Sequence, residues 1–197
     1  MNEVSVGSPF VTELPHTATA EAHVVQFHTD DAFLIDCLSQ FVCSGLGAGE
    51  VVIVIATKKH REGLARALKA RGIDVSGAVK QGRCIVLDAA KTMAKFMAGR
   101  LPNERKFESV IGSLIRKAEA DAPGQRVAVF GEMVALLWKE KKFEAALRLE
   151  QLWNELAKTH FFYLRCAYPT SGFQGQQKGE PYTNICAEHS KVIAAEN

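Results

Sequence analysis

The chain has 197 residues, of which 47% are hydrophobic and 23% charged, and its formal net charge is +2 at pH 7. This length and composition predict one packed domain and exclude a largely disordered chain. Because positive and negative charges are nearly balanced and basic runs are short, the sequence argues against direct binding of nucleic acid.

Membrane insertion and secretion are not indicated either. No stretch of about 18 uninterrupted apolar residues occurs, so no membrane-spanning helix is predicted. The first residues lack the basic segment and apolar core of a secretory signal. The five cysteines form no C-x-x-C pair. They fit buried thiols of a reducing compartment, with a redox switch as the alternative, so we expect a cytoplasmic protein.

The first predicted elements form a strand–helix–strand unit. Residues 1–20 show no hydrophobic period and predict a flexible tail before a single domain over residues 21–197. The unit begins with a strand over 22–27, and its helix starts near Asp31, where apolar residues recur at helical spacing. Its second strand, 51–56, is six apolar residues in a row, which is typical of a strand covered on both faces.

Strands and helices continue to alternate along the chain. Further strands are predicted over residues 83–88, 126–130 and 161–167. Helices are predicted over residues 57–71, 89–98, 103–121, 134–138, 143–160 and 182–195. Five strands separated by helices indicate the α/β class, with a parallel sheet in a three-layer α/β/α sandwich. Trp138 and Trp153 are interpreted as core anchors of their helices.

The candidate ligand-binding residues mostly follow the predicted strands, because such sheets bind ligands beyond the carboxyl ends of their strands. We also expect the C-terminal His189 to fold back over these ends. The candidates are His28, Asp30, Asp31, Thr57, His60, Asp88, Glu132, Tyr168 and His189. We predict no catalytic residue and no metal ligand among them.

Structural roles compete with a binding role at several candidates. Helix N-capping alone can explain Asp30 or Asp31, and likewise Thr57. For Asp88, capping and ligand binding are equally open. Glu132 is harder to explain in that way, since a poorly solvated carboxylate after a buried strand needs a partner or a ligand.

The histidines lack the spacing of known metal motifs. Neither His28 nor His60 belongs to an H-x-x-x-H pair, so a metal-binding role is the minor alternative for both. His23, at the outer end of the first strand, is interpreted as a hydrogen-bonded structural residue. The sequence also lacks G-x-S-x-G, H-E-x-x-H and G-x-x-x-x-G-K-[ST] motifs. The two carboxylates after the first strand would repel phosphate, which excludes an ordinary P-loop enzyme.

Several short motifs resemble the MEDS domain, the sensory domain of methanogen and methylotroph regulators of the DcmR type. They run from His23 to His189, nearly the whole folded part. The matching pieces are His23-x-x-x-Phe27, Asp31-x-x-Leu34, Gly45-Leu46-x-x-Gly49-Glu50, Ala56-Thr57 followed by His60, Gly82-Arg83, Asp88-Ala89, Phe130-Gly131-Glu132-Met133-Val134, Leu149-Glu150-x-x-Trp153-Asn154 and Cys166-x-Tyr168-Pro169. His28 departs from the pattern, which has tyrosine at this position.

The resemblance implies a RecA/KaiC-like fold that lacks the phosphate loop. Its expected strand order is 5-1-4-3-2, with the fourth strand beside the first. The pairs Asp30/Asp31 and Gly131-Glu132 would then be neighbours across the former nucleotide cleft. The implied activity is sensing of small organic molecules rather than catalysis, while the ligand and any cofactor remain unspecified.

The resemblance also bears on partners. Relatives carry the domain beside DNA-binding or histidine-kinase modules, and we find no such module after His189. We therefore expect signalling through a regulatory protein partner, a histidine kinase or a transcription regulator, without direct nucleic-acid or membrane binding. The sequence does not identify the oligomeric state, and a homo-oligomer is one possibility. The alternatives are an enzyme that uses Glu132, Asp88 and a histidine, with or without a divalent metal, and a scaffold whose cleft is filled by side chains.

Overall fold

The structure, a computed structural model, describes residues 23–173 and 179–194, so the tail predicted over residues 1–20 lies outside the described residues. The strands are β1 (His23–His28), β2 (Val51–Ala56), β3 (Cys84–Asp88), β4 (Met97–Ala98), β5 (Leu101–Pro102), β6 (Val127–Gly131), β7 (Phe162–Pro169) and β8 (Lys191–Ile193). The helices are α1 (Asp31–Gly47), α2 (Lys58–Ala70), α3 (Val75–Lys80), α4 (Ala89–Ala94), α5 (Glu104–Phe107), the π-helix η1 (Glu108–Gly112), α6 (Ser113–Asp121), α7 (Met133–Lys139), α8 (Phe143–Ala157), the 3-10 helix η2 (Thr170–Phe173) and α9 (Glu180–Ala187). Within these residues, no helix is both long and apolar enough to cross a membrane.

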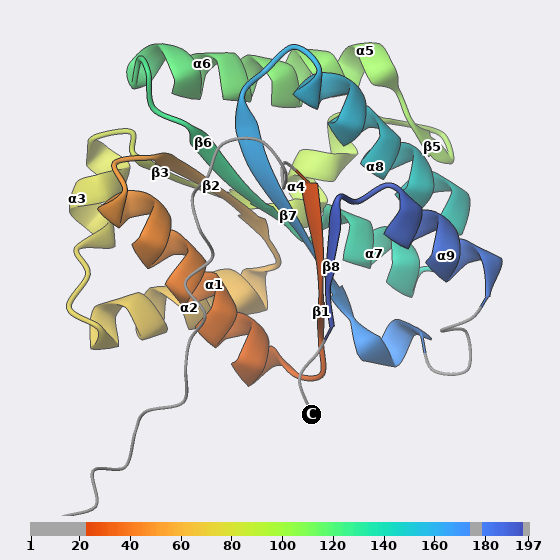
Figure 1. Cartoon of the computed structure of the whole chain (residues 1–197), viewed down its shortest axis with the longest axis horizontal. Helices are drawn as coiled ribbons and strands as arrows, with labels where there is room; N and C mark the ends of the chain where they lie inside the picture. The colour runs from red at the N-terminus through yellow and green to blue at the C-terminus, as the bar shows by residue number, and fades with distance from the viewer. Residues whose placement is uncertain (1–22, 174–178, 195–197) are drawn as a thin grey trace, which may run out of the picture.

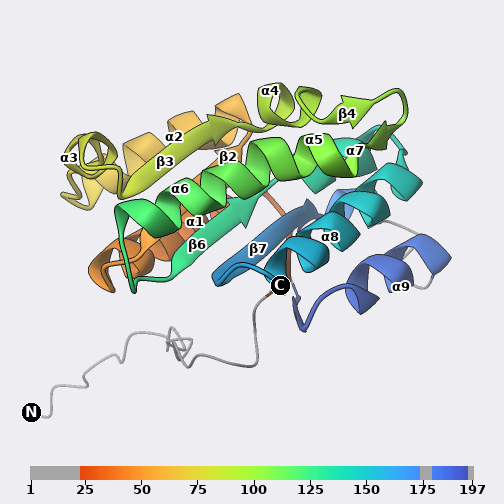
Figure 2. The ribbon, with the colours of Figure 1, turned by 90° about the horizontal axis from the view of Figure 1, so that it is seen from above.

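A parallel sheet with helices on both faces confirms the predicted α/β class (Figures 1 and 2). Within the described part of the chain, its six strands lie in the order β3-β2-β6-β7-β1-β8, and every pair of neighbours is parallel. The strands β4 and β5 form a separate antiparallel hairpin. Trp138 and Trp153 are both buried, as predicted for core anchors.

The predicted strand order 5-1-4-3-2 is wrong. The fifth predicted strand, β7, pairs with β6 on one side and with β1 on the other, so the fourth and first strands are not neighbours. Most residues of β7 are buried, which suits a strand that is hydrogen-bonded along both edges and covered on both faces. β8 then extends the sheet beyond β1.

The continuous apolar run of β2 supplies a core on each side of the sheet. Because successive side chains of a strand point to opposite faces, alternate residues enter different clusters. Val51 and Ile53 pack with residues of α6, α7 and α8, whereas Val52 and Val54 pack with residues of α1 and α2. The two helical layers therefore enclose separate groups of side chains.

Two predicted helices end earlier than expected. The helix predicted over 89–98 stops at Ala94, and Met97 then pairs with Pro102 across a hairpin in which Gly99 has φ +64°, a conformation that favours glycine. The helix predicted over 182–195 is α9 followed by β8. The backbone N–H of Ser190 donates to the carbonyl of His23 at 2.8 Å, which directs the chain alongside β1.

Candidate functional site

The carboxyl ends of the central strands bring a histidine between two carboxylates. His60 lies in the first turn of α2, its Nδ1 contacts Oε1 of Glu132, and its Nε2 lies 3.0 Å from Oδ1 of Asp31. Oε2 of Glu132 also accepts a hydrogen bond of 2.8 Å from the backbone N–H of Thr57. Together with the adjacent His28, these residues form what we call the His60 cluster.

Local structure fixes each member of the His60 cluster. Asp30 caps α1 by accepting from the N–H of Phe33, which leaves Asp31 in the first helical turn. Thr57 caps α2 in the same way, as its hydroxyl oxygen accepts from the N–H of His60. Since α1 and α2 pack together on one face of the sheet, their N-termini lie close together, and their dipoles favour the two carboxylates there.

His28 adds a buried polar atom beside the cluster. It ends β1, it is 4% exposed, and its ring lies perpendicular to that of His60 with the centroids 6.4 Å apart. Its Nδ1 is buried and has no hydrogen-bond partner within the described part of the chain. Burial lowers the pKa of His28 although the charge of Glu132 acts in the opposite direction, so the ring is neutral near pH 7.

His60 has the opposite electrostatic character. Burial acts to lower its pKa, but the hydrogen bonds and negative charges of Glu132 and Asp31 outweigh burial and raise it. The pKa of Asp31 is lowered by its contact with Lys59 and then by the one with His60. The two carboxylates therefore favour the protonated form of the His60 imidazole that lies between them.

We expect the stability of the protein to fall as the pH rises through the raised pKa of His60. The folded state holds this proton more tightly than the unfolded state, so the contribution of His60 is complete below its ordinary pKa of 6.5 and disappears above the folded pKa. Urea unfolding of the wild type and of His60→Gln over about pH 5 to 9 measures the effect. His28 is left unchanged in both proteins because its lowered pKa gives a dependence of opposite sign. The same alkaline loss in both proteins would contradict the assignment.

The structure brings some of the predicted site residues together and separates others. His28, Asp31, Thr57, His60 and Glu132 form the His60 cluster. Asp31 and Glu132 are close, as expected. However, both contact His60, and the strands that precede them, β1 and β6, are not neighbours in the sheet.

The remaining candidates lie outside the cluster. Asp30 is an exposed cap. Asp88 caps α4 and accepts from Arg61 at 2.5 Å. Tyr168 lies near the carboxyl end of β7, but its side chain contacts Glu150 on the opposite face of the sheet. The expectation that His189 folds over the carboxyl ends of the strands is wrong, because it also contacts Glu150 and lies beside the start of β1.

Glu150, His23 and Cys166 are polar residues of that second region which the sequence reasoning did not select. The sequence signal that could have identified this region is the position of Glu150. It stands four residues after Ala146 and three before Trp153, so it lies on the buried face of α8. An acidic residue on a buried stripe requires a partner.

The His60 cluster is suited to a small polar molecule without net charge. The buried charges of Glu132 and His60 balance each other, and Lys59 pairs with Asp31 at the rim. An uncharged ligand does not disturb this balance, whereas a phosphate would approach two carboxylates. The unpaired Nδ1 of His28 offers such a ligand a hydrogen-bonding partner.

Comparison with known proteins identifies a family and solved structures with a related fold. A family model described as MEDS, the methanogen/methylotroph, DcmR sensory domain, matches residues 22–180. Among solved structures, the chain is similar to an uncharacterized protein from Pyrococcus horikoshii in complex with an unknown peptide, with a TM-score of 0.58 at 12% identity. That alignment covers 88% of this chain and 77% of the other and shows a shared fold. No curated protein matches the chain.

Proposed function

The chain belongs to the MEDS family of methanogen/methylotroph, DcmR-type sensory domains, and from this premise we propose that it senses small organic molecules without transforming them. The observation that supports a binding site most directly is the His60 cluster. There a buried imidazole spans Asp31 and Glu132, and the adjacent His28 has an unpaired Nδ1. A ligand that hydrogen-bonds to His28 would lie at the carboxyl ends of the strands, where sheets of this class bind ligands.

The helices that start at the cluster provide a route for reporting the bound state. Asp31 and His60 lie in the first turns of α1 and α2, so a ligand that changes their pairing changes how the two helix ends contact each other. The ligand shifts this equilibrium only as far as it favours one arrangement over the other.

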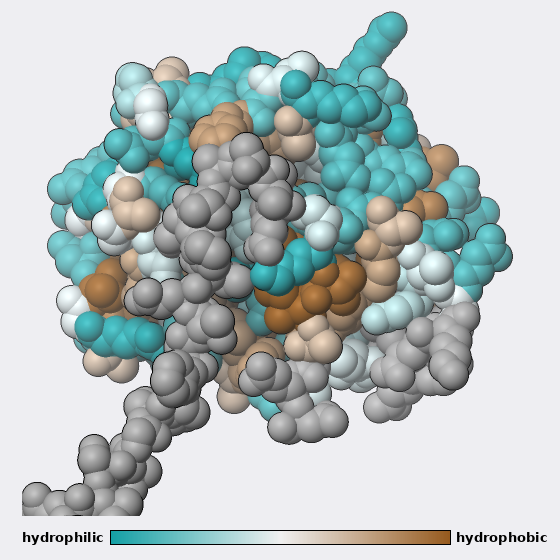
Figure 3. Space-filling view, in the orientation of Figure 1, coloured by the Kyte–Doolittle hydropathy of each residue, from teal (hydrophilic) through white to brown (hydrophobic). Residues whose placement is uncertain are grey.

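We propose that the signal passes to a regulatory protein, a histidine kinase or a transcription regulator, in the cytoplasm. Figure 3 shows a hydrophobic patch in the region of β8 on an otherwise largely hydrophilic face. Val192 of β8 is 43% exposed, and β8 is an edge strand of the sheet. Exposed apolar surface at a sheet edge supports a protein contact.

An enzyme is the alternative, and one observation favours it. His60 has a carboxylate at each ring nitrogen, and an oriented histidine is what general acid–base catalysis requires. Asp88, which that alternative also invokes, is paired with Arg61. Chemical change in a bound compound after incubation with the protein would favour the enzyme over the sensor.

A thermal-shift screen of the full chain, followed by calorimetry, tests the proposal. The panel contains small alcohols, methylated amines, halogenated one-carbon compounds and ATP. At least one uncharged organic compound should raise the melting temperature, and ATP should not. His28→Phe and His60→Gln should abolish the shift. The control is Asp36→Asn, which changes an exposed residue of α1 that pairs with Arg71, and this variant should keep the shift. Binding that survives both cluster variants, or tight binding of ATP, would contradict the proposal.

A further inference from the structure

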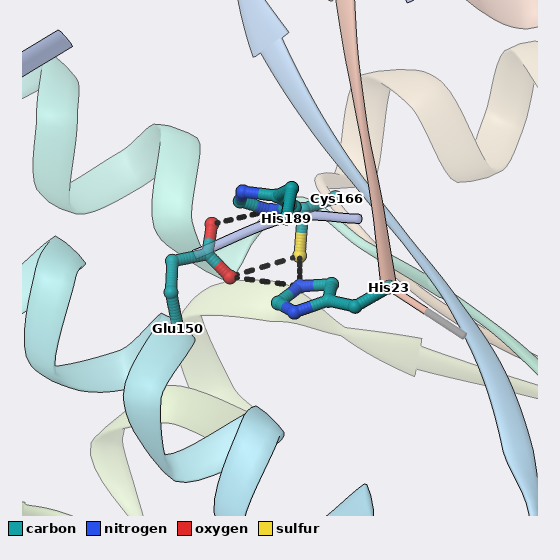
Figure 4. A group of neighbouring side chains, drawn as sticks. All are labelled: His23, Glu150, Cys166 and His189. Carbon is teal, nitrogen blue, oxygen red and sulfur yellow. Dashed lines mark hydrogen bonds and ion pairs between the residues drawn. The ribbon is translucent and has the colours of Figure 1, made fainter. Parts of the chain in front are cut away.

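Four potential metal ligands converge on the face of the sheet opposite the His60 cluster. His23 comes from β1, Glu150 from α8, Cys166 from β7 and His189 from the link between α9 and β8. Figure 4 shows their side chains pointing toward one another. One ligand atom from each lies within 4.8 Å of the others, and all four residues are buried. We call them the Glu150 cluster.

The spacing of these atoms approaches that of a tetrahedral zinc site. Nε2 of His23 lies 3.2 Å from Oε2 of Glu150 and 3.4 Å from Sγ of Cys166, and that sulfur lies 3.2 Å from the same oxygen. Nε2 of His189 lies 3.5 Å from Oε1 of Glu150. With zinc–nitrogen and zinc–sulfur bonds of about 2.0 and 2.3 Å, tetrahedral ligand atoms are separated by about 3.3–3.6 Å. Small movements would therefore suffice to place an ion between them.

Both histidines are oriented as metal ligands usually are, with the outer ring nitrogen donating to a fixed acceptor. Nδ1 of His189 donates to the carbonyl of Ile185 at 2.7 Å. Nδ1 of His23 lies 2.8 Å from Oδ1 of Asn154, whose amide nitrogen donates to Glu188. Because this bonding fixes the amide, its oxygen accepts from His23. Both Nε2 atoms are thus left for the interior of the cluster.

One of these inner atoms lacks a hydrogen bond. Nε2 of His189 is buried and faces Oε1 of Glu150 at 3.5 Å, but it forms no hydrogen bond among the described residues. A buried polar atom in this state costs free energy, so it is an independent sign that the cluster is completed by something else.

We propose that His23, Glu150, Cys166 and His189 bind one zinc ion. A thiolate and a carboxylate supply two negative charges and the imidazoles are neutral, so a divalent cation gives the fully buried site zero net charge. The thiol proton, which Cys166 now donates to Glu150, passes to solvent when the sulfur binds the ion. Mixed imidazole, thiolate and carboxylate ligands suit zinc better than magnesium or calcium.

Four protein ligands make this a closed, structural site rather than a catalytic one. The ion would join β1, β7 and α8 to His189, which precedes β8. The segment from α9 to β8 is otherwise held by contacts that include the hydrogen bonds of Ser190 to His23. Zinc would therefore fix the C-terminal part of the domain, independently of ligand sensing on the other face.

Metal titration of the chelator-treated full chain tests this proposal. We expect one zinc or cobalt ion per chain, and the cobalt form should show a thiolate charge-transfer band with the intense visible bands of tetrahedral cobalt. Cys166→Ala should lose the charge-transfer band and at least tenfold in affinity. Cys84→Ala, which removes a buried cysteine of β3 outside the cluster, should change neither. Hydrogen exchange in α9 should slow when zinc is added to the wild type.

The wild-type measurements decide the matter even if Cys166→Ala does not fold. A folded wild type that takes up no metal would overturn the proposal and leave the cluster as a hydrogen-bonded network. Cobalt bound without the thiolate band, or a band that Cys84→Ala rather than Cys166→Ala removes, would overturn it as well.

Discussion

Replacing Glu150 with alanine is expected to lower the free energy of unfolding of the metal-free protein by about 3–5 kcal/mol, the cost of removing one partner from a buried ionic network. Glu150 is 0% exposed and accepts from the hydroxyl of Tyr168 at 2.7 Å. Burial alone would raise its pKa, but the nearby imidazole of His189, followed by that of His23, holds the pKa of Glu150 well below the usual range. The substitution leaves the histidines and the tyrosine hydroxyl without their shared partner.

The matched control for Glu150 lies on the same helix. Glu155 is exposed and pairs with Lys158 at 2.8 Å, so Glu155→Ala should change stability by only about 0–1 kcal/mol. Urea unfolding in the presence of a chelator measures both variants. Equal stability of the two would show that the network around Glu150 contributes little to the folded state.

Replacing Glu132 with alanine should also be costly, with a loss of about 3–5 kcal/mol. Glu132 is 3% exposed, contacts Nδ1 of His60 and accepts from the N–H of Thr57. Alanine leaves both groups without this partner at the start of α2. Glu140→Ala, which removes an exposed partner of Lys142, is the control and should change stability by about 0–1 kcal/mol.

The conservative variant Glu132→Gln separates folding from sensing. Its amide oxygen can still accept from the N–H of Thr57, so we expect the domain to fold with a loss of about 1–3 kcal/mol. Without the negative charge, His60 no longer bridges two carboxylates. We therefore expect the affinity for a bound compound to fall at least tenfold, and the thermal shift that this compound causes to shrink. If Glu132→Gln unfolds the domain, or if it binds the compound as the wild type does, then Glu132 serves structure alone.

The layers of the fold could be predicted from sequence, whereas the order of the strands could not. Apolar runs such as 51–56 show that a strand is covered on both faces, and such strands demand helices on each side. β6 shows the same pattern, so an apolar run does not reveal which strand neighbours β1. β8 is three residues long, too short for a periodic signal, and it is placed by contacts with β1.

The His60 cluster was accessible from sequence because parallel strands end at a common edge. Polar residues after β1, β2 and β6 could be expected to meet there whatever the order of the strands. The bridging position of His60 was not predictable, since it depends on how α1 and α2 pack against each other.

The Glu150 cluster was harder to anticipate because its members are far apart in the chain. His23 and Cys166 are separated by 143 positions, and they meet only through the pairing of β1 with β7. No local spacing marks them as ligands. The motif pieces that contain His23, Glu150 and Cys166 lie in separate parts of the sequence, and only the fold shows that they converge.

The imidazole signals of the histidines in an NMR spectrum test the sensing site most directly. The full chain, which has six histidines, is titrated with the compound that gives the largest thermal shift. We expect the ring signals of His28 and His60 to shift and to saturate at the affinity found by calorimetry, while those of His23 and His189 stay unchanged. Signals of His28 and His60 that do not move while the compound binds would contradict a sensing site at the His60 cluster.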